Sequence, residues 1–262
     1  MTESTQLGGR VALVTGGGTG IGLAIATHLA RLGASVAITS RKEENLADGR
    51  RRIEDDTNAD IYATVCNVRD PDAVTAAVEA VANDVGPPTI LVNNAAASFA
   101  CRAEELSQNG WRAVQETVLW GTWFCSTAVA PYMFDNGGGV ICNVLSTIVD
   151  TGAAGNAHSA AAKAGVASLT KSLGVEWAPR GVRVVAISPG PVDTPGSREY
   201  VWKERFDEVS ASLPMQRMAS PDEIANVVGF LCSPGASYVN GAILLADGGA
   251  TLAAGTLLPG PE

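Results

Sequence analysis

The sequence predicts an α/β fold: a single domain in which helices flank a doubly wound parallel sheet. Short apolar runs alternate with longer helical stretches along the 262 residues, and no linker rich in proline, serine or charge interrupts them. Near-continuous apolar runs are typical of parallel strands that helices cover on both faces. A chain of this length often folds around one sheet, so residues 1–262 are taken as one domain.

Seven apolar runs are expected to form the strands, in chain order. They are residues 11–14, 36–39, 61–65, 90–93, 139–144, 182–187 and 242–246. Helices are expected between them, among others from near Ile21 and over residues 72–84, 113–130 and 160–177. The connection at 189–218 is expected to be irregular. Its length favours a substrate lid, at about 191–218.

The first strand leads into a glycine-rich loop and then a helix, which predicts a dinucleotide site in a Rossmann-type fold. Gly16 permits a tight turn, Gly20 permits close approach of a diphosphate, and Gly22 permits close packing of helix on strand. The free backbone N–H groups and the dipole of a helix N-terminus favour the negative charge of that diphosphate.

The end of the second strand indicates which nicotinamide cofactor binds. An acidic residue there would bind the ribose hydroxyls of NAD, whereas this chain has Ser40, Arg41 and Lys42. A guanidinium can contact a 2′-phosphate with two parallel hydrogen bonds, so NADP is the expected cofactor. The alternative is that these are solvated charges in a turn.

Composition excludes several classes of function. A net charge of −9 argues against a nucleic-acid partner, and no apolar run reaches the ~20 residues that a membrane span needs. The first ten residues hold no apolar core, so a cytoplasmic location is expected. Five cysteines without metal or redox spacing, and only two histidines, predict no metal site.

Motifs along nearly the whole chain resemble those of the short-chain dehydrogenase/reductase family. They are residues 15–22, 93–96, Ser146, Lys163, 189–190 and 247–249. The resemblance implies a homotetramer and a serine, tyrosine and lysine at the reacting centre. It implies that Asn93 braces the central strand and Lys163 holds the nicotinamide ribose. It further implies cofactor contacts at Gly16, Thr19, Gly20, Ile21, Gly22, Ser40, Arg41, Asn67, Val68, Asn94, Ala95, Pro189, Gly190 and Val192.

One departure from the family pattern bears on the reaction. Ser159 stands where the family tyrosine precedes the lysine by four residues, and a serine hydroxyl is too weak an acid to replace it at neutral pH. Residues 158–166, 176–177 and 189–191 resemble the branch of 2,4-dienoyl-CoA and trans-2-enoyl-CoA reductases, where serine is usual at that position. That branch reduces carbon–carbon double bonds with NADPH.

The same branch implies two polar groups that this chain lacks. The dienoyl reductases have a tyrosine fifteen residues before the lysine and an asparagine before a Gly-Thr pair, where this chain has Ile148 and Trp120. These two residues and Tyr200 are expected in the substrate pocket, around the acyl group of a substrate such as a thioester. Water near Lys163 or Ser146 is the first candidate for the proton donor, and Tyr200 the second.

Lys163, Ser146 and Ser159 are the expected catalytic residues, because an ammonium and two hydroxyls can stabilise a developing enolate. Structural interpretations stay open for several residues: Ser146 bonding backbone, Ser159 capping a helix, and Trp120 in the core or a subunit interface. His158, one residue from Ser159, is interpreted as packing rather than catalytic.

Three functions therefore remain open. The first is an NADPH-dependent reductase of an activated double bond, in an enoyl or dienoyl thioester. The second is a non-redox isomerase, dehydratase or cyclase on the same fold. The third is a cofactor-binding homologue without catalysis. The intact glycines and Lys163 favour the first, while Ile148 and Trp120 favour the other two.

Overall fold

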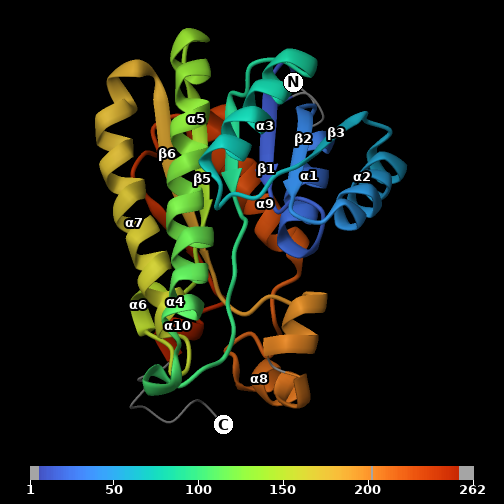
Figure 1. Cartoon of the computed structure of the whole chain (residues 1–262). Helices are drawn as coiled ribbons and strands as arrows, with labels where there is room; N and C mark the ends of the chain where they lie inside the picture. The colour runs from blue at the N-terminus through green and yellow to red at the C-terminus, as the bar shows by residue number, and fades with distance from the viewer. Residues whose placement is uncertain (1–5, 202, 254–262) are drawn as a thin grey trace.

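The computed structural model describes residues 6–201 and 203–253 of the chain. Seven strands form one parallel sheet in the order β3-β2-β1-β4-β5-β6-β7 (Figure 1). Their bounds are β1 Val11–Thr15, β2 Ser35–Ser40, β3 Ile61–Val65, β4 Ile90–Asn93, β5 Gly139–Val144, β6 Val182–Pro189 and β7 Ile243–Ala246. The chain reverses its direction of winding between β1 and β4, so both carboxyl ends border the crevice where doubly wound sheets bind ligands.

Helices cover both faces of the sheet and bury its apolar side chains. One face carries α1 (Gly20–Arg31), α2 (Glu43–Thr57) and α9 (Pro221–Cys232), packed over a core that includes Ile25 and Val228. The other face carries α3 (Pro71–Asp84), α5 (Gly121–Asp135) and α7 (Ala157–Trp177). The predicted doubly wound α/β architecture is thus confirmed, because strands buried on both faces need no polar alternation.

Local side chains set where the helices begin. Asp70 caps α3 by accepting bonds from Asp72 N and Ala73 N, and Pro71 occupies the first helical position. Ser220 and Glu223 form a capping box at the start of α9. The shorter helical segments are η2 Ala103–Glu105, α6 Ile148–Thr151, η4 Ala178–Arg180, η7 Pro234–Ala236 and α10 Ala250–Ala253.

The helix predicted over residues 113–130 is longer and less regular than expected. It comprises α4 (Gln108–Gln115), one π-helical turn, η3 (Glu116–Trp120), and α5. The start was missed because Gln108 to Arg112 offer few apolar residues, whereas Ser107 caps the helix by accepting a bond from Gly110 N. α7 likewise begins three residues before the predicted position.

The prediction that 189–218 is irregular was wrong in part. β6 continues to Pro189, and the segment that follows contains η5 (Ser197–Val201), η6 (Lys203–Arg205) and α8 (Phe206–Ser212). These pieces are short and partly exposed, so they leave no helical apolar period in the sequence. In Figure 1, α8 stands beyond the carboxyl ends of the strands, across from α4, α6 and α10.

Within the described ranges, no helix combines the length and apolar character that crossing a membrane requires. Those same ranges contain no group of three or more histidine, cysteine or acidic side chains placed to hold a metal ion. All five cysteines are free thiols, and four of them are buried.

Candidate functional site

The glycine loop between β1 and α1 has the backbone shape that a diphosphate needs. Gly16 and Gly20 have φ of 65° and 55°, a region that favours glycine. A methyl group at Gly22 would lie 2.3 Å from Gly16 O and 2.4 Å from Asn94 Nδ2, so the helix can sit this close only with glycine. At Gly20 the nearest atom to an added methyl group would be Thr194 Cγ2 at 3.7 Å, an ordinary van der Waals contact between the loop and the start of the lid.

The start of α1 offers unsatisfied backbone donors beside that loop. Thr19 is its N-cap residue, its side chain makes no capping bond, and the first turn contains no acidic residue. Backbone N–H groups of the first turn, including that of Ile21, are therefore available to an anion. The residues present fit a nicotinamide dinucleotide, with its diphosphate over Gly20 and the helix N-terminus.

Asn94 ties this loop to the end of β4. Its side chain donates to Thr15 O at 3.0 Å and Gly16 O at 3.2 Å, while the N–H groups of Asn94 and Ala95 both donate to Thr15 Oγ1 at 3.0 Å. The buried Thr15 hydroxyl was not singled out in the sequence, because a threonine ending a strand has many ordinary roles. The Thr15 hydroxyl holds the carboxyl ends of β1 and β4 at a fixed separation.

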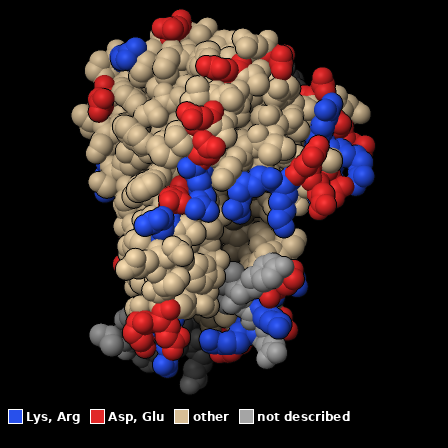
Figure 2. All heavy atoms as spheres, viewed as in Figure 1, with Lys and Arg blue, Asp and Glu red and all other residues tan. Residues whose placement is uncertain are grey.

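The residues expected to contact the adenosine half follow β2 and β3. Ser40 ends β2 and is half-buried, Arg41 beside it is exposed, and Ser40 Oγ accepts a bond from Lys42 N at 3.4 Å. After β3, Asn67 is exposed and Val68 is buried. Figure 2 shows basic side chains gathered beside a hollow on this face of the molecule.

Lys163 is buried beneath the carboxyl end of β5. Its side chain comes from α7, is 7% exposed, and donates from Nζ to Val144 O at 2.5 Å. Burial lowers the pKa of its ammonium to about 8, and within residues 6–201 and 203–253 it forms no ion pair. An ammonium without a neutralising carboxylate can place its charge at a developing anion.

The two predicted serines lie on the elements that hold Lys163. Ser146 follows β5, between two residues whose N–H groups bond β6: Leu145 N to Ile187 O and Thr147 N to Pro189 O. Ser159 is the third residue of α7 and is buried, so the alternative that it caps the helix was wrong, and Asn156 holds that position. Among the described residues neither hydroxyl forms a hydrogen bond, so both can donate to a substrate.

The three predicted pocket residues lie in different surroundings. Ile148 begins α6, just after β5, and is half-buried. Trp120 is 50% exposed, so it is no core residue, and it lines a cavity of about 620 Å³ together with Trp111 and Gln115. Tyr200 has its backbone in η5, but its side chain lies outside the described part of the structure.

Glu116 shows a contact that the sequence could not reveal. Arg69, in the loop after β3, donates from Nε to Glu116 Oε2 at 2.8 Å and forms an ion pair with it. The Glu116 side chain is only 17% exposed, so this pair is more than a solvated charge. It connects the loop carrying Asn67 and Val68 to the π-helical turn that ends at Trp120.

His158 is wholly buried with its ring edge-on to Phe99, 4.4 Å between centroids. Burial lowers the pKa of its imidazole, which favours the neutral form. Its carbonyl accepts a bond from Gln115 Nε2 at 2.7 Å. These contacts fit the expected packing role.

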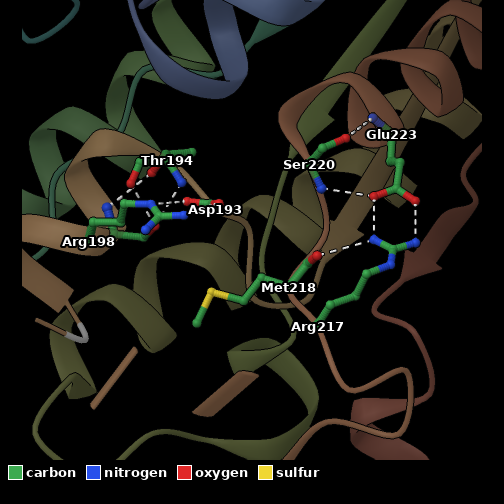
Figure 3. Close-up of polar contacts among 8 residues, drawn as sticks. Asp193, Thr194, Arg198, Arg217, Met218, Ser220 and Glu223 are labelled. Atoms are coloured by element: carbon green, nitrogen blue, oxygen red, sulfur yellow. Dashed lines mark hydrogen bonds and ion pairs between the residues drawn. The ribbon is translucent and has the colours of Figure 1, made fainter. Parts of the chain in front are cut away.

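The lid is fastened at its base, as Figure 3 shows. Arg217 pairs with Glu223 through two bonds of 2.7 Å, and Glu223 also accepts from Ser220 N at 2.8 Å. At the other end Arg198 donates to both oxygens of Asp193 at 2.6 Å. An isolated parallel bridge between Val192 and Ala219 closes the neck between these two clasps.

A buried polar network behind the site was only partly predicted. Asn93 donates to Asn143 Oδ1 at 2.9 Å and to Ser126 Oγ at 3.1 Å, and Asn143 donates to Thr170 Oγ1 at 2.9 Å. The chain of bonds joins α5, β4, β5 and α7, the helix that carries Lys163. Asn143 in an otherwise apolar strand was the available signal, because a buried amide needs partners.

Comparisons with known proteins extend over nearly the whole chain. A family model described as enoyl-(acyl carrier protein) reductase matches residues 16–251. A Bacillus subtilis (strain 168) protein named "Probable 2,4-dienoyl-CoA reductase" is 39% identical over 244 residues, covering 92% of this chain and 96% of that protein. A peroxisomal 2,4-dienoyl-CoA reductase of Danio rerio is 37% identical over 248 residues, covering 94% and 83%.

Solved structures share the fold as well as the sequence. A short chain dehydrogenase from Bacillus anthracis superposes with a TM-score of 0.84 at 38% identity, covering 95% of this chain and 98% of that one. A short chain dehydrogenase/reductase family protein superposes with a TM-score of 0.83 at 34% identity, covering 93% and 98%.

Proposed function

Because the chain belongs to the short-chain dehydrogenase/reductase family, we propose that it is an NADPH-dependent reductase of an activated carbon–carbon double bond in an enoyl or dienoyl thioester. The proposal rests on Lys163, whose buried ammonium forms no ion pair among the described residues, and on the hydroxyls of Ser146 and Ser159, which form no hydrogen bond there. The relatives named as 2,4-dienoyl-CoA reductases support the same substrate class.

A reduced nicotinamide dinucleotide, held at the glycine loop and the N-terminus of α1, would supply a hydride for the β or δ carbon of the acyl thioester. The chain's own groups then carry the negative charge that forms on the thioester oxygen. Ser146 and Ser159 donate hydrogen bonds to that oxygen, and the Lys163 charge stabilises it. The proton that completes the reduction comes from water held near Lys163. Ile148 cannot supply it, because this apolar side chain stands where the dienoyl reductases have a tyrosine.

The decisive experiment mixes purified protein and NADPH with enoyl-, dienoyl- and ketoacyl thioesters, and follows the absorbance of the reduced nicotinamide. We expect oxidation with unsaturated thioesters, and a loss of about 10³-fold in kcat/KM for Lys163→Met. Lys171→Met is the matched control, because Lys171 lies on the same helix and is exposed. Product analysis shows whether the double bond or the carbonyl was reduced.

The outcome also separates the other two functions. Product formation without NADPH oxidation would indicate an isomerase, dehydratase or cyclase. Cofactor binding that Lys163→Met leaves unchanged, with no product formed from any thioester of the panel, would indicate a cofactor-binding protein without catalysis. Either result overturns the reductase proposal.

The preference for NADP rests on Arg41, which is exposed beside the end of β2 and free to meet a 2′-phosphate. We expect Arg41→Gln to lower the ratio of NADPH to NADH affinity by about tenfold or more, measured by fluorescence titration. Arg52→Gln, an exposed arginine further along α2, should leave the ratio unchanged. An unchanged ratio in Arg41→Gln would remove Arg41 from the site.

We also propose a homotetramer. Trp111 and Trp123 are exposed on α4 and α5, and Leu244 and Leu245 are exposed on the edge strand β7. Large exposed apolar side chains on two separate faces fit two self-complementary interfaces, which closed symmetry combines into a tetramer. Light scattering after size exclusion measures the mass. We expect Trp123→Glu to give dimers, and a monomeric wild-type chain would contradict the proposal.

A further inference from the structure

A second cavity lies at the amino-terminal edge of the sheet, the end opposite to α8 and α10 in Figure 1. Its volume is about 760 Å³, and its lining includes Arg10, which precedes β1, and Arg183, the second residue of β6. The glycine loop and Lys163 lie at the carboxyl edge of the same strands. The cavity therefore belongs to neither the cofactor site nor the candidate catalytic site.

Neutral oxygens hold both guanidinium groups in place. Arg10 donates from Nε to Thr89 Oγ1 at 2.9 Å and from Nη2 to Thr89 O at 3.1 Å. Arg183 donates from Nη1 to Val239 O at 3.1 Å, and from Nη2 to Leu231 O at 2.9 Å and Ser233 O at 3.5 Å. Since a guanidinium has five N–H groups, at least two on each arginine lack an acceptor among the described residues.

Neither Arg10 nor Arg183 forms an ion pair within the described ranges, although the chain carries a net charge of −9 and other arginines pair with acids. Both are half-buried. Burial lowers the pKa of both guanidiniums, and the charge of Arg10 contributes to the lowering at Arg183. Two close, partly buried cations of like charge favour binding of an anion between them.

We propose that this cavity binds a phosphate group, as inorganic phosphate or as a small phosphomonoester, between Arg10 and Arg183. A phosphate dianion can neutralise both charges, and its oxygens match the forked donors of two guanidiniums. A volume of about 760 Å³ lies in the range of small-molecule sites and leaves room for an organic group beyond the phosphate.

The test is calorimetric titration of the full chain, saturated with its nicotinamide cofactor so that phosphate cannot occupy that site. Inorganic phosphate and glycerol 3-phosphate are the probes, and acetate is the singly charged comparison. We expect saturable one-site binding of phosphate, with acetate at least about tenfold weaker. Tighter binding of glycerol 3-phosphate would identify an organic phosphate as the ligand, and equal or tighter binding of inorganic phosphate would identify the free ion.

Variants locate the binding. Arg10→Gln and Arg183→Gln should each weaken phosphate binding by about tenfold or more, but both also lose bonds that hold the fold. Ser237→Asp avoids that difficulty, since Ser237 is exposed, lines the cavity, and would add a negative charge there. Ser168→Asp, an exposed serine on α7, is its matched control and should bind phosphate normally. Absence of saturable binding, or affinity unchanged in all three cavity variants, would overturn the proposal.

Discussion

The two halves of the carboxyl edge of the sheet form the candidate site by different means, one with backbone and the other with side chains. In the half formed by β1, β2 and α1, the site is a backbone shape, set by Gly16, Gly20 and Gly22 and held by the amide of Asn94. In the half formed by β5, β6 and α7, the candidate site consists of side chains, with Lys163 against Val144 O and the hydroxyls of Ser146 and Ser159. A site built from backbone shape therefore tolerates little change, whereas side chains on a rigid frame can be exchanged and so change the chemistry.

The largest effect is expected in the backbone-built half. Gly22→Ala puts a methyl group 2.3 Å from Gly16 O, so the loop or α1 must move. We expect a loss of more than about 3 kcal/mol in the free energy of unfolding and loss of cofactor binding. Urea denaturation followed by circular dichroism and a fluorescence titration with NADPH measure the two.

The matched control for Gly22→Ala is Gly196→Ala in the lid. The nearest atom to an added methyl group at Gly196 is Thr194 Oγ1 at 3.9 Å, and its φ is outside the left-handed region. That variant should change the free energy of unfolding by less than about 1 kcal/mol. Equal effects of the two substitutions would show that the backbone cradle is less constrained than its contacts indicate.

In the side-chain half, we expect removal of the key group to stabilise the protein. The pKa of Lys163 is about 8 against an ordinary value of 10.5, so holding its charge costs roughly 3 kcal/mol at pH 7. Loss of the bond to Val144 O offsets part of this. Lys163→Met should therefore raise the free energy of unfolding by roughly 2 kcal/mol at pH 7, while kcat/KM falls about 10³-fold.

The pH dependence follows from the direction of that shift. Below pH 8 the folded and unfolded chains both carry the proton, and the full cost is present. Between pH 8 and 10.5 only the unfolded chain keeps the Lys163 proton, so the free energy of unfolding of the wild type rises. The stability advantage of Lys163→Met over the wild type therefore shrinks. Urea unfolding at several pH values measures this difference, and an advantage that is constant with pH would contradict the buried charge.

Much of the backbone-built half could be predicted from the sequence, because glycine spacing and apolar strands act locally. Gly16 has the positive φ that a tight turn needs, and all seven strands lie where apolar runs indicated. The lid helices and the start of α4 were missed, since exposed, mostly polar residues carry no period. Contacts such as Arg69 with Glu116 join residues 47 apart, and only the folded chain brings them together.

The network that connects the halves should give an intermediate effect. Asn143→Leu keeps the approximate volume but removes the acceptor for Asn93 Nδ2 and the donor to Thr170 Oγ1. Leaving buried polar groups with fewer partners should cost about 2 kcal/mol in urea unfolding, and should lower kcat more than it raises KM as α7 shifts. Asn136→Leu, on the exposed end of α5, is the control. A pure stability effect with unchanged kcat would limit the network to the fold.

The smallest effect is expected at the lid base. The Arg217 hydrogen bonds, followed by that of Ser220 N, lower the pKa of Glu223 to about 2, so the clasp is intact above the ordinary carboxyl range and weakens only as pH falls toward 2. The pair is about half exposed, so solvent screens most of its energy.

We expect Arg217→Gln at pH 7 to leave the melting temperature nearly unchanged but to speed hydrogen exchange of Asp193 N and Ala219 N about twofold to threefold. Arg205→Gln breaks a more exposed pair, with Glu208, away from the neck. If these two amides exchange at the same rate in both variants, the Arg217–Glu223 pair does not hold the lid. If they exchange faster only in Arg217→Gln, the lid turns on its bridge at Val192 and Ala219, and its opening is set separately from the rigid frame behind it.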